Sequence, residues 1–187
     1  DLKPEQSVEG ETIECKPDAP TSLFIFKTLY EPNLGQISFF KVKSGEIKQN
    51  DKLENSRNEE IEILNQLYIM DGKNREPVEK LSAGDIGATL KLKYTETNDT
   101  LRTKGSNITI KPIKFPEPRI TKAISAVDKN DEEKLNEALR KIHSQDPTVS
   151  IKFSKELRQQ ILSCQGELHL ATIDWVLQKV YGIKTSF

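Results

Sequence analysis

The stretch Gly166-Glu167-Leu168-His169-Leu170 marks the start of a helix and decides the fold of the second half of the chain. Apolar residues recur from there at helical spacing, so we expect a helix from Glu167 to about Tyr181. Its buried stripe consists of Leu170, Ile173, Leu177 and Val180. Gly182 is typical of a residue that ends a helix, and a last strand should begin at Ile183.

The segment before this helix contains a second helix between strands. Residues 120–127 indicate a strand, and Asn130-Asp131-Glu132-Glu133 is a helix start with a capping residue and a carboxylate three positions later. The stripe of that helix is Leu135, Ala138, Leu139 and Ile142. Further strands are expected over 148–153 and around 159–162. The resulting order, β-α-β-β-α-β, is that of the α+β ferredoxin-like sandwich.

The first half of the chain favours strands throughout. Leu23-Phe24-Ile25-Phe26 indicates a buried strand, residues 37–42 a second one, and apolar runs continue at 61–68 and 86–92 between Asn-, Asp- and Gly-rich turns. Phe39 and Phe40 are neighbours on a strand, so at most one of them can face solvent. We therefore expect an all-β β-barrel over residues 21–112.

Prolines separate these two domains. Pro112, Pro116 and Pro118 stiffen a connector at 113–118, after which the ferredoxin-like domain occupies 119–187 with a truncated last strand. Residues 1–20 carry six acids and two bases and no apolar periodicity. We expect an extended acidic tail there that lies on an absent domain or is disordered. Because Asp1 is not an initiator Met, we also expect a piece of a longer protein.

Composition is ordinary for a soluble protein: 30% of the 187 residues are charged, 35% are hydrophobic and the net charge is −1. No apolar run approaches the ~20 residues of a membrane span. We expect a cytoplasmic monomer whose two cysteines, Cys15 and Cys164, are thiols. No metal site is expected, since His143 and His169 are the only histidines and lack a third ligand.

A basic stretch runs from residue 104 to residue 122, where Glu117 is the only acid. Its cations are Lys104, Lys111, Lys114, Arg119 and Lys122. Contact with phosphate is one interpretation of this stretch, and a solvated linker is the other. The weak net charge does not favour unaided binding to nucleic acid.

Two loops carry polar residues near the ends of the expected helices. Gln145-Asp146-Pro147 follows the first helix, and Asp146 suits a turn because its carboxylate can bond nearby amides. Glu167 and His169 lie in the first turn of the second helix, whose free N–H groups attract anions. Neither loop shows a nucleophile beside a base, so no catalytic residue is expected.

The motifs of this chain resemble, in order and spacing, the second and third domains of the elongation factor G family. The motifs are Gly35-Gln36-Ile37-Ser38-Phe39-Phe40, Ser44-Gly45, Ala83-Gly84-Asp85-Ile86, Asp99-Thr100-Leu101, Phe115-Pro116-Glu117-Pro118, Gln145-Asp146-Pro147 and Gly166-Glu167-Leu168-His169-Leu170. The resemblance covers roughly residues 21–187. Departures at Asn50, Ser163 and Cys164, where the family favours glycine, indicate a divergent paralogue.

This resemblance implies a non-catalytic middle fragment of a ribosome-dependent GTPase that acts in translocation. Its partners would be small-subunit RNA and protein and the missing domains of the same chain. The chain has no phosphate-binding loop, so no cofactor is expected in it, and GTP and magnesium would belong to a missing N-terminal domain. Alternatives are a fragment of a ribosomal protection protein or release factor, a free-standing RNA-binding module and, more remotely, an independent enzyme.

The resemblance also implies two groups of site residues. An interface with the ribosome or the GTPase domain would use Gln145, Asp146, Pro147, Gly166, Glu167 and His169. A fusidic acid cleft would be lined by Pro116, Pro118, Asp146, Thr148, Leu168 and His169. The side chains of Ser163 and Cys164 are expected to narrow that cleft.

Overall fold

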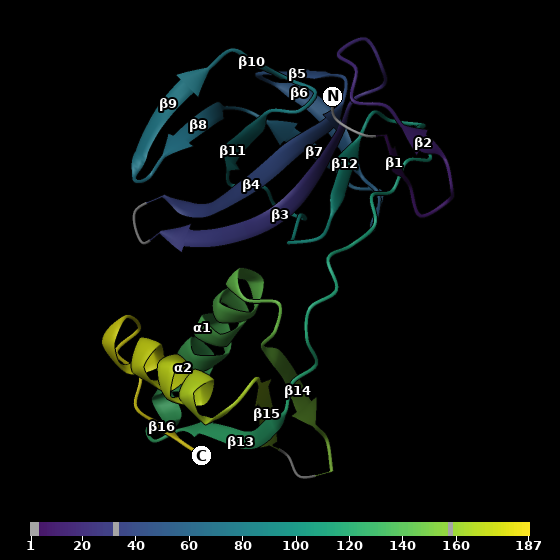
Figure 1. Ribbon diagram of the computed structural model, residues 1–187. Helices are drawn as coiled ribbons and strands as arrows, with labels where there is room; N and C mark the ends of the chain where they lie inside the picture. Colours follow the sequence, from purple (N-terminus) through teal and green to yellow (C-terminus); the bar gives the residue numbers. More distant parts are fainter. Residues whose placement is uncertain (1–3, 32–33, 157–158) are drawn as a thin grey trace. The chain divides into compact units, whose positions relative to one another are not determined.

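The computed structural model describes residues 4–31, 34–156 and 159–187. It consists of two compact units, residues 1–113 and 114–187, with separate apolar cores (Figure 1). None of the helices in the described ranges is long and apolar enough to cross a membrane.

The first unit is built from antiparallel strands. They are β1 (Glu5–Gln6), β2 (Thr12–Ile13), β3 (Ser22–Glu31), β4 (Gly35–Ser44), β5 (Glu46–Lys48), β6 (Asp51–Asn55), β7 (Ile61–Leu64), β8 (Leu67–Asp71), β9 (Asn74–Val78), β10 (Lys80–Ser82), β11 (Ile86–Leu90) and β12 (Thr100–Arg102). Eight of them form a sheet in the order β7-β6-β12-β3-β4-β11-β8-β9, while β5 pairs with β10. The sheet curls into the expected barrel-type domain (Figure 1).

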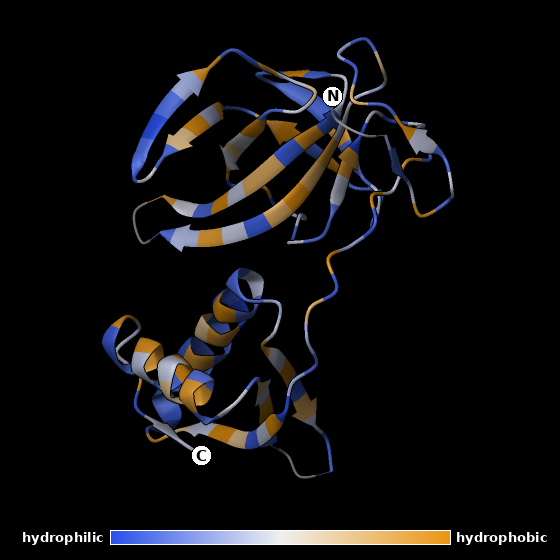
Figure 2. Cartoon of the chain, in the orientation of Figure 1, coloured by the Kyte–Doolittle hydropathy of each residue, from blue (hydrophilic) through white to orange (hydrophobic). Residues whose placement is uncertain are grey.

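The barrel core is formed by the continuous buried run at the start of β3 and by the alternating buried residues of β4. Phe40 is fully buried with Leu23 and Ile25, while its neighbour Phe39 is half-buried and lies 6.4 Å from the Phe26 ring, centre to centre. Each fully buried side chain of this size contributes about 1.5–3 kcal/mol of transfer free energy. Figure 2 shows a continuous apolar stretch in β3 beside the more mixed colouring of β4. The apolar run at 61–68 is two strands, β7 and β8, rather than one.

The N-terminal residues differ from the expected free acidic tail. Strands β1 and β2 pair as a hairpin, and Ile13, 3% exposed, packs against Phe24 and Ile110. The Val8 N–H donates to the Thr109 carbonyl at 2.8 Å. A single buried isoleucine produces no periodicity, which explains why the sequence pattern does not show this contact.

The second unit has the expected order β-α-β-β-α-β. Its elements are β13 (Ile120–Ala126), a 3-10 turn η1 (Lys129–Asp131), α1 (Glu132–Gln145), β14 (Ser150–Ser154), β15 (Gln159–Cys164), α2 (Glu167–Lys179) and β16 (Thr185–Ser186). The antiparallel sheet has the order β14-β15-β13-β16. Both helices cover one of its faces (Figure 1). Leu135, Leu139, Leu162 and Leu177 are fully buried between these layers.

The start of α1 differs slightly from the expected one. Asp131 is the residue before α1, and its side chain makes no capping hydrogen bond. Asp128 instead caps the preceding turn η1, where its carboxylate accepts the Asn130 N–H at 2.9 Å. Glu132 then opens α1 and accepts the Ala126 N–H.

The end of α2 also differs. The helix stops at Lys179, and Gly182 with φ +68° allows the chain to turn away. Val180, expected in the buried stripe, follows the last helical residue and is 56% exposed. The stripe of α2 therefore ends at Leu177.

Candidate functional site

Asp146 and His169 join the two loops that follow α1 and precede α2. Asp146 is the last-turn cap of α1, where its N–H donates to the Ile142 carbonyl at 2.9 Å and Pro147 then excludes further helix. His169 lies in the first turn of α2. The Nε2 atom of His169 is 3.2 Å from Oδ2 of Asp146. We call this contact, with its two loops, the clasp.

The Asp146 carboxylate uses its two oxygens for different contacts. Its Oδ1 atom accepts the Thr148 N–H at 2.9 Å and the Thr148 hydroxyl at 2.6 Å, which is the turn expected for Asp before Pro. The other oxygen, Oδ2, is left facing His169. Asp146 thus forms the expected turn with one carboxylate oxygen and contacts His169 with the other.

The hydrogen bonds of His169 define its tautomer. The Gln165 N–H donates to Nδ1 at 3.3 Å, so Nδ1 carries no proton and Nε2–H faces the carboxylate. Gln165 also donates from its Nε2 atom to the Pro116 carbonyl at 3.0 Å. Gln165 therefore links the clasp to the start of the second unit, a role that sequence reasoning missed.

A small hollow of about 170 Å³ lies beside the clasp. It is lined by Ile142, Gln145, Asp146, His169, Thr172, Ile173 and Val176. Pockets for drug-sized ligands are usually roughly 300–1,000 Å³. This hollow is thus too small to enclose such a ligand by itself.

The structure places the six predicted interface residues in these two loops. Gln145 ends α1 and donates to the Lys141 carbonyl, and Pro147 is half-buried. Gly166 is the cap of α2, with extended backbone at φ 172°, and exposed Glu167 opens the helix. The two loops are distant in sequence, and the Asp146–His169 contact joins them in space. The interface role of these residues stays a prediction.

The residues predicted for a fusidic acid cleft are only partly brought together. Asp146, Thr148 and His169 are in direct contact, and Pro116 is joined to them through Gln165. Leu168, by contrast, is 84% exposed, and Pro118 is half-buried. The cleft itself stays a prediction.

Cys164 does not narrow that cleft as expected, whereas for Ser163 the expectation stays a prediction. Cys164 is fully buried in the core of the second unit, and its thiol lies 3.7 Å from the Gly166 carbonyl. Ser163, as its strand neighbour, points to the opposite face of the sheet, where its hydroxyl bonds Thr121 at 3.0 Å. Strand alternation therefore directs these two side chains to opposite faces of the sheet.

The five cations predicted for phosphate contact are all exposed. Lys104 and Lys111 belong to the first unit, and the second contains Lys114, Arg119 and Lys122. The Arg119 backbone N–H donates to the Cys164 carbonyl at 2.9 Å, and the residue is exposed. Phosphate contact stays a prediction.

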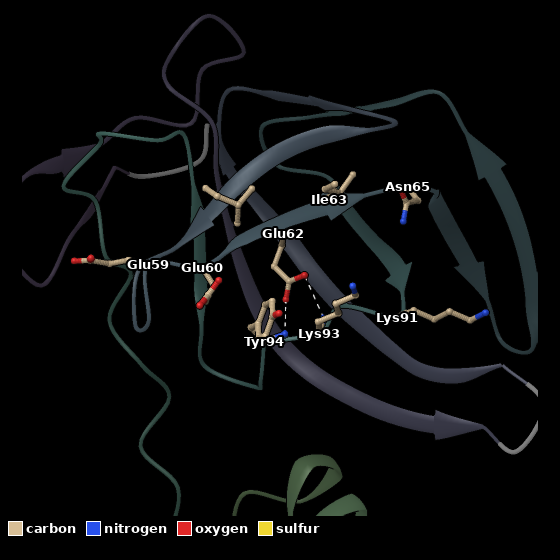
Figure 3. A pocket seen from close by; sticks show the side chains of 9 residues that line it. Glu59, Glu60, Glu62, Ile63, Asn65, Lys91, Lys93 and Tyr94 are labelled. Atoms are coloured by element: carbon tan, nitrogen blue, oxygen red, sulfur yellow. Dashed lines mark hydrogen bonds between the residues drawn. The ribbon is translucent and has the colours of Figure 1, made fainter.

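A larger hollow in the first unit was not predicted. It measures about 430 Å³ and lies along β7 (Figure 3). Its lining residues are Glu59, Glu60, Ile61, Glu62, Ile63, Asn65, Lys91, Lys93 and Tyr94. We call it the β7 groove. The alternation Glu60-Ile61-Glu62-Ile63 predicts buried isoleucines and exposed glutamates, but the structure exposes Ile61 and Ile63 and buries Glu62, so no local signal in the sequence marks the groove.

Buried polar groups support the end of this groove. Glu62 is 3% exposed, and its carboxylate accepts the Tyr94 N–H at 2.7 Å and the Thr95 hydroxyl at 2.8 Å. Nearby, Asp99 binds Arg57 at 2.7 Å, and this hydrogen bond raises the pKa of the Arg57 guanidinium. These bonds hold the 93–99 segment against the β6–β7 hairpin.

The two units match consecutive domains of one class of translation factor. Residues 20–104 match the family described as elongation factor G domain 2, and residues 115–187 match elongation factor G, domain III. Together they include both cores. The units are therefore domains of a translation elongation factor, in the expected order.

Individual relatives agree with this assignment. Elongation factor G 2 of Syntrophomonas wolfei is 39% identical over 95% of this chain, and elongation factor G of Thermotoga maritima is 35% identical over 94%. A crystal structure of a protein from Thermus thermophilus aligns with a TM-score of 0.78 and 28% identity over 91% of this chain and 26% of that one. The chain belongs to the elongation factor G family. It spans 26% of the length of the curated relatives.

Proposed function

We propose that this chain is the middle part of a ribosome-dependent GTPase that acts in the translocation step of translation elongation. It contributes ribosome contact and inter-domain coupling rather than catalysis. Support comes from the match to domains II and III of elongation factor G and from relatives that carry that name. The proposed partners are RNA and protein of the small ribosomal subunit and the other domains of the same protein, in the cytoplasm.

The clasp is the observation that carries the coupling role. It ties the end of α1 to the start of α2 through one Nε2–Oδ2 contact of 3.2 Å, with the Asp146 side chain 40% exposed. A partner that contacts either loop therefore acts on the other. Allosteric coupling requires an element of this kind with two arrangements that different partners favour unequally. GTP and magnesium are proposed to bind elsewhere in the longer protein.

The test uses the full-length parent protein with Asp146→Asn and His169→Gln, singly and together. We expect ribosome-stimulated GTP hydrolysis and translocation to fall on the order of tenfold, since coupling energies of 1–3 kcal/mol are typical. Hydrolysis without ribosomes should be unchanged. The double variant should be no worse than either single one, because both remove the same contact.

Asp174→Asn is the matched control, because Asp174, like Asp146, is a carboxylate that accepts a threonine hydroxyl, that of Thr185, but lies away from the clasp. If the clasp variants and this control lower ribosome-stimulated hydrolysis equally, the effect is general destabilisation and the proposed coupling is wrong.

A further inference from the structure

Strand β7 is an edge of the eight-stranded sheet, and the β7 groove runs along it. The strand pairs with β6 on one side, with Leu53 opposite Glu62. On the other side stands a wall formed by Lys91, Lys93 and Tyr94. An edge strand beside a groove is the setting in which proteins add an extended peptide as a further strand.

The hydrogen bonds between β6 and β7 determine which backbone groups face the groove. The Asn55 N–H donates to the Glu60 carbonyl at 2.9 Å, and the Asn50 N–H donates to the Leu64 carbonyl at 2.8 Å. Even-numbered residues of β7 therefore face β6, and the backbone groups of Ile61 and Ile63 are directed away from it. The Ile63 carbonyl meets the Asn65 N–H in a local turn. The Ile61 amide and carbonyl and the Ile63 amide are directed toward the groove.

Charge changes sign along the groove. Figure 3 shows Glu59 and Glu60 at one end and Lys91 at the other, with Tyr94 and Lys93 between. The middle is apolar and accessible: Ile61 is 40%, Ile63 42% and Tyr94 47% exposed. A complementary ligand therefore has a basic end, an apolar middle and an acidic end.

The groove is held by unusual backbone at both ends. Four non-glycine residues in the described part of the chain have positive φ, and two of them line the groove: Glu59 at 60° and Lys91 at 59°. Such conformations persist where the surroundings enforce them, and they gather at ligand sites. Neither residue is a glycine, Asn or Asp, for which this backbone is common.

We propose that the β7 groove binds an extended peptide segment of a partner protein, which adds to β7 as an antiparallel strand. This site is independent of the ribosome contacts proposed above. Four residues of β7 span ~14 Å, so the segment has about five residues. Its acidic end lies at Lys91 and Lys93, and its basic end at Glu59 and Glu60. The glutamates disfavour a phosphate backbone.

The experiment is a titration of the isotopically labelled 187-residue chain with a seven-residue peptide, followed by amide chemical shifts. The peptide has acidic residues at its amino end, alternating valine and threonine in the middle and lysines at its carboxyl end. We expect the largest shifts at the Ile61 and Ile63 amides and slower hydrogen exchange there. The variant Ile61→Lys/Ile63→Lys should weaken binding at least tenfold.

Ile69→Lys and Ile86→Lys are the matched controls, because these isoleucines are 43% and 57% exposed on β8 and β11 and do not line the groove. They should bind the peptide as the wild type does, with equal melting temperatures. A peptide of the same composition with its charged ends exchanged should bind at least fivefold more weakly.

Several results overturn the proposal. Equal binding of the two peptides would contradict the proposed order of charges in the ligand. Equal weakening by the control variants would show that the peptide does not bind in the β7 groove. Shifts at Ile61 and Ile63 that grow with protein concentration alone identify a second copy as the occupant. Shifts there with a single-stranded RNA oligonucleotide, but not with peptide, assign the groove to RNA.

Discussion

Gly45 is the residue at which the first unit depends most on the absence of a side chain. It has φ +75°, and a Cβ atom there would lie 2.6 Å from the Thr21 Cα and 2.7 Å from the Ala19 carbonyl. Its own N–H donates to the Lys16 carbonyl at 2.8 Å and its carbonyl accepts the Ala83 N–H at 2.9 Å. Gly45 thus joins the N-terminal segment to the barrel where no larger residue fits.

Gly45→Ala should lower the free energy of unfolding by about 3 kcal/mol, from the left-handed backbone and from overpacking against backbone atoms. Gly72→Ala is the control: φ is +57° there, but nothing lies within 4 Å of the new Cβ atom, so about 1–2 kcal/mol is expected. Chemical denaturation followed by circular dichroism measures both. Equal losses would show that the contact with Thr21 relaxes freely.

At the scale of elements, the short pair β5–β10 relies on charge. Glu46 lies opposite Ser82 in this pair, and its carboxylate is 2.9 Å from Nζ of Lys80 and 3.3 Å from Nζ of Lys48. The hydrogen bond from Lys80, followed by that from Lys48, lowers the pKa of Glu46 below its ordinary 4.5. Three-residue strands have few ladder bonds, so such side-chain contacts help to set their pairing.

The lowered pKa of Glu46 gives stability a specific pH dependence. Its contribution is fully present above the ordinary pKa of 4.5 and is lost as pH falls through the lower folded value. Glu46→Gln should therefore have a lower melting temperature than the wild type at pH 7. This difference in melting temperature should disappear as the pH falls below 4.5. Thermal unfolding at a series of pH values is the measurement. A difference that stays constant from pH 7 to pH 3 would contradict the assignment.

At the scale of the whole molecule, the two units have self-contained cores. Phe40 and its neighbours fill one, and the leucines between the sheet and helices of the second unit fill the other. The units meet in sequence at Ile113 and Lys114. Domains joined in this way usually unfold with some independence.

Trypsin should therefore cut first after Lys114. Lys114 is exposed, whereas Lys111 is followed by Pro112, which resists cleavage, and the Arg119 N–H is bonded to Cys164. Mass spectrometry of a short digestion should find fragments 1–114 and 115–187. First cleavage within β4 or α2 would mean that the units are not independently folded.

The sequence by itself determined the class of each domain and the order of its elements. Periods of about two and 3.6 residues are local, so residues 37–42 and the stripe from Leu170 to Leu177 specify a strand and a helix without knowledge of their partners. The prolines between 112 and 118 likewise mark the boundary. Local patterns were weakest at the N-terminus, where Ile13 is a single buried apolar residue whose partners, Phe24 and Ile110, are distant in sequence.

Only the tertiary structure decided which side chains meet. The Asp146–His169 contact and the role of Gln165 depend on two helix ends that lie 23 residues apart in sequence. The β7 groove needs Ile61 and Lys91 from separate strands and loops. Periodicity reports which face of an element is buried, but contacts between elements depend on packing over the whole domain, which no local pattern contains.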